Sequence, residues 1–194
     1  YNADGLRVQK MVNGVATKYT LHGKNIVHMT SGADELHFFY DAQNKPAVVI
    51  FNGIAYAYLY DLQGDVIGLV DNNGTQMVSY TYDAWGKMLS KTGTLASTLG
   101  TIQPFRYRGY ALDEETELYY NQSRFYNPSI ARFITADTTG VLTASLKSLT
   151  EKNLFAYCDN NPVMRKDIDG AFWDTFFDIV SLAVNVCEVI ANPT

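Results

Sequence analysis

The sequence is short of cysteine, proline and charge. Two cysteines among 194 residues, Cys158 and Cys187, are too few for a disulfide framework. They either pair with each other or serve as small buried hydrophobic residues, and we favour the second interpretation. The chain has five prolines and 18% charged against 47% hydrophobic residues, which argues against disorder and is enough to bury a core. A formal net charge of −5 disfavours a nucleic-acid surface, which is usually basic.

Signatures of common catalytic and metal sites are absent as well. There is no G-x-G-x-x-G after a strand, no P-loop and no G-x-S-x-G. His22, His28 and His37 have no C-x-x-C or H-x-x-x-H companion, so we expect ordinary strand histidines, with no metal and no cofactor. No signal peptide is visible, and Tyr1 begins in the middle of a pattern, so we expect a piece of a longer protein.

Aromatic residues are abundant and recur with a period. Fourteen tyrosines, ten phenylalanines and fourteen glycines favour β structure. A tyrosine followed four residues later by a turn residue recurs at intervals of 18 to 22 residues, at Tyr1, Tyr19, Tyr40, Tyr60 and Tyr82. A second series of turn signals falls between them, at Asn13-Gly14, Ser31-Gly32, Asn52-Gly53 and Asn73-Gly74.

The two series predict repeated hairpins. Asn-Gly suits a type I′ turn, and Asp-x-x-Gly suits a type I turn followed by a left-handed glycine. Each unit then reads strand, turn, strand, turn, with strands of roughly six to eight residues. Alternation places Tyr56, Tyr58 and Tyr60 on one face of a strand, and Val78, Tyr80 and Tyr82 on one face of another. An unrelated antiparallel meander is the alternative interpretation.

Residues 105–137 combine aromatic and basic side chains. The aromatic members are Phe105, Tyr107, Tyr110, Tyr119, Tyr120, Phe125, Tyr126 and Phe133, and the basic ones are Arg106, Arg108, Arg124 and Arg132. We expect a sheet with guanidinium groups over aromatic rings. Such interleaving also suits nucleic acid, but the acidic neighbours Asp113, Glu114, Glu115 and Glu117 favour internal pairing.

This segment, FRYRGYALDEETELYYNQSRFYNPSIARFITAD, resembles the Rhs-associated core of Rhs/YD-repeat proteins, and the preceding period resembles their YD repeats. The resemblance implies a mainly β fold, in which antiparallel YD-repeat hairpins form a curved sheet, a segment of a β-shell, followed by a short C-terminal helix. It divides the chain into repeats at 1–104, the core at 105–170 and the start of a variable region at 171–194. The sequence departs from the family pattern at Glu117, Asn127, Ala131 and Ile168.

Four further segments carry weaker signals. We expect Ser90–Pro104 to form a loop without a strong strand, and 138–152 to be irregular with one short helix around 145–152. Residues 153–157 are predicted to form a strand, with 159–162 as its turn. From Phe172 onward, polar residues spaced by three or four predict an amphipathic helix ending at Asn192-Pro193, too polar to span a membrane.

By resemblance, the core is an aspartyl self-cleaving element. The residues at matching positions are Asp137, Asp167 and Asp169, with Arg132 as the cation that holds a partner, and cleavage falls near Gly170-Ala171-Phe172. Two carboxylates sharing a site divide the roles of acid and base. Alternatively these aspartates hold turns, and Arg132 stacks on Tyr126 or pairs with Asp137.

The function implied by the resemblance is containment and delivery of a C-terminal effector, usually a toxin, which is the partner of this region. The parent protein would be secreted or at the cell surface. An open strand edge at Tyr1 predicts self-association or cover by the tail. The rival function is a cell-surface adhesion or carbohydrate-binding module like the teneurins, with Trp85 or Trp173 as an exposed platform.

Overall fold

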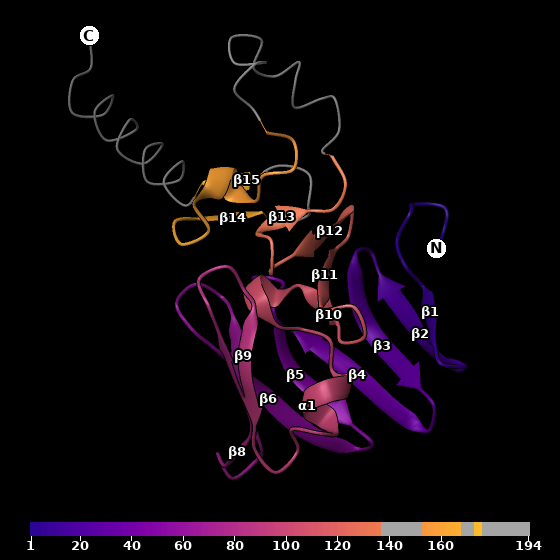
Figure 1. The fold of residues 1–194 in the computed structure, drawn as a ribbon. Coiled ribbons are helices and arrows are strands. Elements are labelled where there is room, and N and C mark those ends of the chain that lie inside the picture. Colours follow the sequence, from indigo (N-terminus) through magenta and orange to yellow (C-terminus); the bar gives the residue numbers. More distant parts are fainter. Residues whose placement is uncertain (137–152, 168–172, 176–194) are drawn as a thin grey trace, which may run out of the picture.

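The computed structural model describes residues 1–136, 153–167 and 173–175. Nine strands form one antiparallel sheet in sequence order (Figure 1). They are β1 (Gln9–Val12), β2 (Val15–His22), β3 (Asn25–Ser31), β4 (Asp34–Tyr40), β5 (Pro46–Phe51), β6 (Ile54–Tyr60), β7 (Val66–Val70), β8 (Gln76–Tyr82) and β9 (Met88–Thr92). The predicted series of hairpins at a common period is confirmed.

The Asp-x-x-Gly turns share one hydrogen-bond pattern. The Oδ1 atom of Asp61 accepts hydrogen bonds from the backbone N–H groups two and four residues later, both at 2.9 Å, and Asp71 and Asp83 do the same at 2.8–2.9 Å. Gly64, with a φ of 86°, closes the first of these turns in the left-handed region. The aspartate that follows each of these strands thus accepts two backbone N–H groups of the turn, which have no strand partner there.

The second turn series is of three kinds. Asn13-Gly14 and Asn52-Gly53 have positive φ at both residues, as a type I′ turn requires. At Ser31-Gly32 the glycine has positive φ and the serine is the last residue of β3. Asn73-Gly74 belongs to the Asp71 turn, so the prediction of a type I′ turn there was wrong.

β-Bulges that recur along the sheet bend it. The register shifts between Phe39 and Tyr40, and again before Tyr60 and Tyr82, at the end of each long strand. A β-bulge bends a strand and increases its twist, so repeated bulges curve the sheet. At the same places, the hydroxyl groups of Tyr40, Tyr60 and Tyr82 donate to backbone carbonyls of the neighbouring strand at 2.8, 2.5 and 2.8 Å. The repeated tyrosine thus satisfies a carbonyl beside each bulge.

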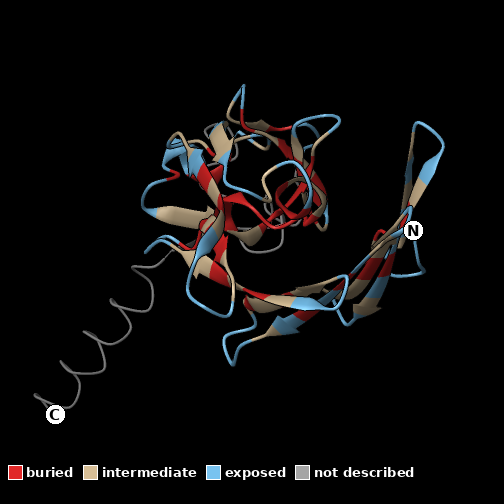
Figure 2. Ribbon diagram, turned by 90° about the horizontal axis from the view of Figure 1, so that it is seen from below, coloured by how far each residue is buried: buried red, intermediate tan, exposed pale blue. Residues whose placement is uncertain are grey.

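The concave face of the sheet carries the first hydrophobic core. Figure 2 shows the sheet as a curved band, with buried residues along its strands and the later part of the chain on the inner side of the curve. The fully buried members include Leu36, Val49, Val66, Leu69, Val78 and Leu99. Leu99 belongs to α1 (Leu99–Ile102), and β9 extends to Thr92, so the expected loop at 90–104 contains a strand end and one helical turn.

A second, smaller sheet follows in the order β10–β13 and lies over the open side of the first (Figure 1). Its strands are β10 (Ala111–Asp113), β11 (Leu118–Asn121), β12 (Arg124–Asn127) and β13 (Arg132–Phe133). The 3₁₀ turn η1 (Tyr107–Gly109) precedes it, and η2 (Cys158–Asn160) comes later in the chain. Finally, β14 (Arg165–Asp167) pairs with β15 (Trp173–Thr175).

Two predictions for the C-terminal part need correction. Residues 153–157 form a turn with one bridge, Ala156 to Arg132, and the predicted strand there was wrong. Residues 173–175 form a strand, since β14 offers them a hydrogen-bonding edge, although helical periodicity was expected from Phe172. The short helix expected around 145–152 and the remainder of the C-terminal helix lie outside the described residues.

Two departures from the family pattern occupy left-handed backbone. Glu117 and Ala131 stand where the Rhs core has glycine, and both have a φ of 56°. A side chain in this region costs energy that glycine avoids. Both residues thus adopt a backbone conformation that glycine adopts more readily.

Candidate functional site

The core segment, which we define as residues 105–133 together with 153–167, docks on the last turn of the curved sheet. Three tyrosines donate their hydroxyl groups to three consecutive backbone carbonyls of that turn. Tyr107 reaches Ala84 at 3.0 Å, Tyr126 reaches Trp85 at 2.7 Å and Tyr119 reaches Gly86 at 2.7 Å. The bond to Gly86 is buried and the other two are part-buried, so all three hydroxyls hold the turn and the core segment together. We call this contact the tyrosine clamp.

The clamp lies within a dense aromatic cluster. Tyr107, Tyr119, Tyr126 and Tyr157 are at most 1% exposed, and the rings of Tyr126 and Tyr157 are 4.2 Å apart. Burial raises the pKa of Tyr107 to about 12, so its hydroxyl keeps its proton and can donate at neutral pH. The predicted aromatic sheet is therefore present, and it is the second hydrophobic core of the chain.

Arg106 is buried at the junction between the two sheets. Its guanidinium lies 4.3 Å from the ring centre of Tyr80 and 3.3 Å from the carboxylate of Glu114. Its Nη1 atom also donates to the carbonyl of Phe105 at 2.9 Å. The carbonyl of Arg106 in turn accepts from the backbone N–H of Val66 at 3.1 Å, which joins the core segment to β7.

Arg108 and Asp65 form a second junction. The backbone N–H of Arg108 donates to Asp65 Oδ1 at 2.8 Å, and its Nε atom lies 3.6 Å from the same oxygen. Burial raises the pKa of Asp65, against the opposing effect of Arg108. Arg108 has a φ of 55°, a conformation that this backbone hydrogen bond helps to hold. Its Nη2 atom also reaches the carbonyl of Pro162, which ties the late part of the core segment to the same point.

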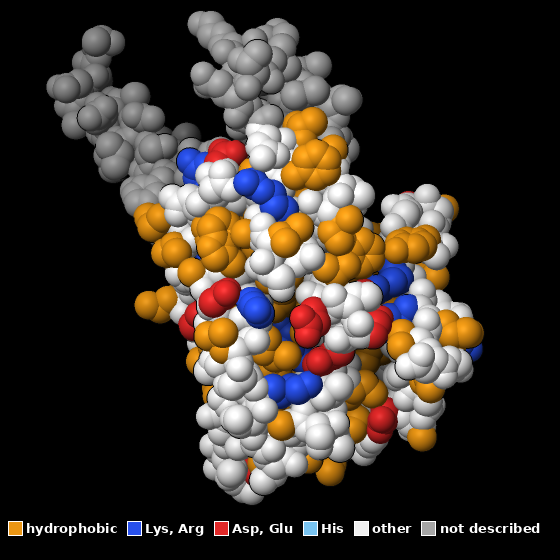
Figure 3. All heavy atoms as spheres, in the orientation of Figure 1, with side chains coloured by type: hydrophobic (Ala, Val, Ile, Leu, Met, Phe, Trp, Pro, Cys, Tyr) orange, Lys and Arg blue, Asp and Glu red, His pale blue; other side chains and the backbone are white. Residues whose placement is uncertain are grey.

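A third junction uses charges from the first repeat. Arg7 contacts Asp113 at 2.5 Å and stacks on Tyr120, whose hydroxyl accepts the backbone N–H of Arg7 at 3.1 Å. Lys10 pairs with Asp113 and Glu115, both at 2.9 Å. In Figure 3, acidic and basic side chains alternate across the middle of the visible face. Asp113, Glu114 and Glu115 therefore pair internally, as the sequence predicts.

Asp167 is the described member of the predicted self-cleavage site. It is 2% exposed, and its carboxylate pairs with Arg124 at 3.0 Å. Its backbone carbonyl accepts hydrogen bonds from Asn121 Nδ2 at 3.0 Å and from the hydroxyl of Tyr110. Arg124 also lies 3.6 Å from the ring centre of Phe133. A buried aspartate is thus fixed at the end of β14 by both its backbone and its side chain.

The other predicted site residues lie apart from this contact or outside the described residues. Arg132 donates to Asn160 Oδ1 at 3.1 Å, and Asp137 and Asp169 are not among the described residues. The predicted cleavage bonds at 170–172 fall between the paired strands β14 and β15, again outside the described part. Sequence reasoning missed Arg124 as the cation at Asp167, because β12 and β14 are distant in sequence.

A cavity of about 180 Å³ separates the concave face from the core segment. Its lining includes Arg7, Tyr40, Phe105, Tyr110 and Lys166. Burial, together with nearby Lys45 and Arg108, lowers the pKa of Lys166 to about 8. Both charged and aromatic side chains line this space.

The structure also bears on the predicted carbohydrate platform, the two cysteines and a membrane span. Trp85 packs against the second core and is half-buried, which disfavours it as a carbohydrate platform; the side chain of Trp173 lies outside the described residues. Cys158 is buried and free of a disulfide, as favoured above, while Cys187 lies outside the described part. Within that part, no helix is long and apolar enough to cross a membrane.

The curved sheet of hairpins, closed by an aromatic and arginine-rich segment, defines a YD-repeat shell segment. The teneurin YD-shell family model matches residues 13–163, and the chain belongs to this family of Rhs/YD-repeat proteins. The tRNA nuclease WapA of Bacillus subtilis strain 168 is 36% identical over 174 residues, covering 88% of this chain and 7% of WapA. Double-stranded DNA deaminase toxin A of Burkholderia cenocepacia is 33% identical over 104 residues, covering 52% of this chain and 7% of that protein.

Solved structures agree on the fold. The Photorhabdus luminescens Tc holotoxin pore has a TM-score of 0.65 at 19% identity, over 88% of this chain and 8% of that one. The complex TcdB2-TccC3-Cdc42 has a TM-score of 0.64 at 21% identity, over 88% and 9%. The chain spans less than a tenth of the length of these proteins. It is related to Rhs-type toxin proteins through their shell.

Proposed function

We propose that this chain is a wall segment of a shell that contains and delivers a C-terminal effector of its own parent protein. The observation that carries this proposal is the tyrosine clamp together with the three charged junctions, which close the core segment over a concave sheet. These contacts join residues far apart in sequence, such as Arg7 and Asp113. A wall needs such internal ties because it has to keep its curvature when its interior is filled.

The cavity in this chain is too small to hold an effector, so other parts of the parent protein have to enclose it. At about 30 Å³ for each water molecule, 180 Å³ holds roughly six waters, far less than a folded effector. Containment therefore requires further repeats in the parent protein. The outer edges of β1 and β9 have no strand partner among the described residues, and an unpaired edge can accept another repeat or a second copy.

Protease protection tests containment. The parent protein carrying its C-terminal region is digested under native conditions, and the same region produced alone is digested in parallel. We expect the region to survive much longer inside the parent, because the wall excludes the protease. Equal rates of digestion would contradict containment and would leave the wall fold untouched. Such a parent would be exported, as its family resemblance implies, and fractionation of the producing cells tests that separately.

We also propose that Asp167 takes part in self-cleavage near Gly170-Ala171-Phe172, with Asp137, Asp169 and Arg132 as further participants. The support is a buried carboxylate held by Arg124 at the start of the connection that contains the bond. Aspartyl cleavage needs a second carboxylate close to the first, one acting as acid while the other activates water. The proposal assigns that role to Asp137 or Asp169.

Intact mass of a chain extended past Thr194 tests this step. We expect a fragment that begins near Ala171, and its loss in Asp167→Asn. A fragment that persists in Asp167→Asn but disappears in Asp137→Asn or Asp169→Asn would assign the chemistry to those residues alone. A single uncleaved species of the extended chain would contradict self-cleavage.

The open edge of β1 leads to a separate proposal of self-association. Light scattering of the 194-residue chain checks it, and we expect a concentration-dependent dimer. Met11→Pro should weaken this contact, because Met11 and Ala16 form a non-hydrogen-bonded pair, so the N–H of Met11 points to the open edge and proline removes it. A monomer at all concentrations would contradict it.

A further inference from the structure

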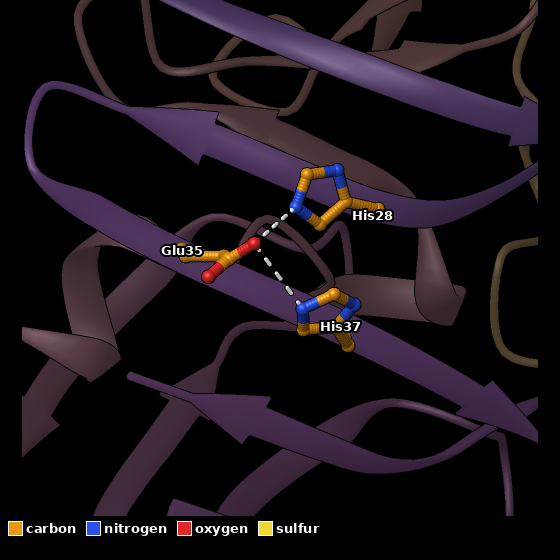
Figure 4. Close-up of side chains that lie close together, drawn as sticks. All are labelled: His28, Glu35 and His37. Atoms are coloured by element: carbon orange, nitrogen blue, oxygen red, sulfur yellow. Dashed lines mark hydrogen bonds and ion pairs between the residues drawn. The ribbon is translucent and has the colours of Figure 1, made fainter. Parts of the chain in front are cut away.

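Two of the three histidines meet a glutamate on the convex surface of the sheet. His28 lies on β3, and Glu35 and His37 lie on β4. The register places His28 directly opposite His37, while their neighbours Met29 and Leu36 pair on the buried face. The three side chains converge in Figure 4, where both imidazole rings turn toward the same carboxylate. The linear sequence does not show this cluster, because the residues meet through strand pairing.

The distances suit a single metal ion. Glu35 Oε1 lies 2.9 Å from His28 Nε2 and 3.3 Å from His37 Nε2. One ligand atom from each residue can be chosen so that all lie within 4.8 Å of one another. In a tetrahedral zinc site, bonds of about 2.1 Å place neighbouring ligand atoms roughly 3.4 Å apart. Small rotations of exposed side chains would reach that geometry.

Hydrogen bonds around the cluster hold it in place. The Nδ1 atom of His28 lies 3.5 Å from the hydroxyl of Thr20, which leaves Nε2 for the shared site. The backbone N–H of Glu35 donates to Asn52 Oδ1 at 2.9 Å, and its carbonyl accepts from Asn52 N–H at 3.0 Å. Such partners orient the ligands of metal sites. Without a metal, an Nε2 atom can hydrogen-bond to the carboxylate only as an N–H donor. A metal ion between the three side chains could take the place of both N–H protons.

We propose that His28, Glu35 and His37 bind one Zn²⁺ ion on the outer surface of the wall. Two imidazole nitrogens with one carboxylate oxygen form a ligand set that zinc uses, and the two imidazoles disfavour magnesium, which prefers oxygen ligands alone. The side chains are 28%, 55% and 47% exposed, so the ion can enter from solvent and keep a water ligand. The ion would cross-link β3 to β4 and stabilise this hairpin. This inference is independent of the containment proposal.

The third histidine gives a matched control. His22 is exposed at the end of β2 and lies outside the cluster, so His22→Ala removes one imidazole and leaves the site complete. The chain is prepared without a polyhistidine tag, stripped with chelator and titrated with ZnCl₂ by calorimetry, with MgCl₂ as the comparison ion. Thermal unfolding is followed with and without ZnCl₂, because binding to the folded state raises the unfolding temperature.

We expect one Zn²⁺ per chain in the wild type and in His22→Ala, with a raised unfolding temperature, and no comparable response to MgCl₂. His28→Ala and His37→Ala should each weaken binding roughly tenfold or more and abolish the thermal shift. Glu35→Gln should weaken zinc binding less than the histidine variants do, because the amide oxygen can still coordinate the ion although it carries no charge. The proposal is overturned if the wild type binds no zinc, or if binding is unchanged in His28→Ala and His37→Ala while all variants remain folded.

Discussion

Replacing Gly86 with alanine tests how tightly the core segment closes on the curved sheet. Gly86 ends the last Asp-x-x-Gly turn with a φ of 86°, and a Cβ atom there would lie 2.5 Å from Cγ of Tyr107, well inside van der Waals contact. Gly74 ends the preceding turn with a φ of 79°, and a Cβ atom there would meet nothing within 4 Å, so Gly74→Ala is the matched control. Both substitutions strain the backbone alike, and one of them also disturbs the tyrosine clamp.

The expected magnitudes follow from these contacts. The left-handed conformation costs an alanine about 1–2 kcal/mol, and the lost flexibility of the unfolded chain returns about 0.4–1 kcal/mol. Gly74→Ala should therefore lower the free energy of unfolding by about 1 kcal/mol. At Gly86 the buried ring of Tyr107 has to move as well, and overpacking of this kind adds about 1–3 kcal/mol. Gly86→Ala should thus cost about 2–4 kcal/mol.

Urea unfolding followed by tryptophan fluorescence measures both values, and Trp85 lies beside the substituted residue. A double-mutant cycle isolates the contact, because Gly86→Ala in a Tyr107→Leu background should cost no more than Gly74→Ala does. Equal losses for the two single alanine variants would refute the reasoning, since they would show that the ring does not press on this turn.

Three further predictions concern buried charge and the buried thiol. Arg106→Met should lower the free energy of unfolding by about 3–5 kcal/mol, because it leaves the buried carbonyls of Gly100, Gln103 and Phe105 without this donor. Glu114 keeps its ion pair with Lys91. Arg165→Met removes an exposed ion pair and should cost less than about 1 kcal/mol by the same urea assay; similar losses would contradict the role of burial. Burial lowers the pKa of Lys166 to about 8 in the folded chain, so its charge opposes folding below that pH. Lys166→Met should therefore be more stable than wild type at about pH 7, and the gain should fade as the pH rises from about 8 to 10.5; a gain independent of pH would count against this. Burial raises the pKa of the Cys158 thiol to about 12, so iodoacetamide at about pH 8 should leave it unmodified in the native chain and label it in urea, as read by peptide mass; rapid native labelling would contradict its burial.

Periodic features of the fold could be read from the sequence. The Asp-x-x-Gly turns were predictable because one carboxylate and one left-handed glycine suffice to build them, without help from distant residues. The alternation of Tyr56, Tyr58 and Tyr60 likewise placed one face inward, and the structure buries the first two. The guanidinium–ring contacts were expected as a class, and Arg106, Arg108 and Arg124 confirm it.

Features that depend on contacts between residues distant in the sequence could not be predicted from the sequence. The pairing of Asp167 with Arg124 and the meeting of His28 with His37 need the register of strands, which single residues do not reveal. The strand at 173–175 arises because β14 offers it an edge, and helical periodicity gave no sign of that partner. Glu117 and Ala131 keep left-handed backbone without the expected glycine, since the surrounding sheet holds their conformation.

A cryo-electron microscopy map of the parent protein with its C-terminal region would show whether this chain forms part of a wall around an effector. We expect the edge of β1 to continue into a preceding hairpin, the tyrosine clamp to close over the concave face, and effector density to lie inside the wall. A map with β1 facing solvent and the effector outside the sheet would contradict it.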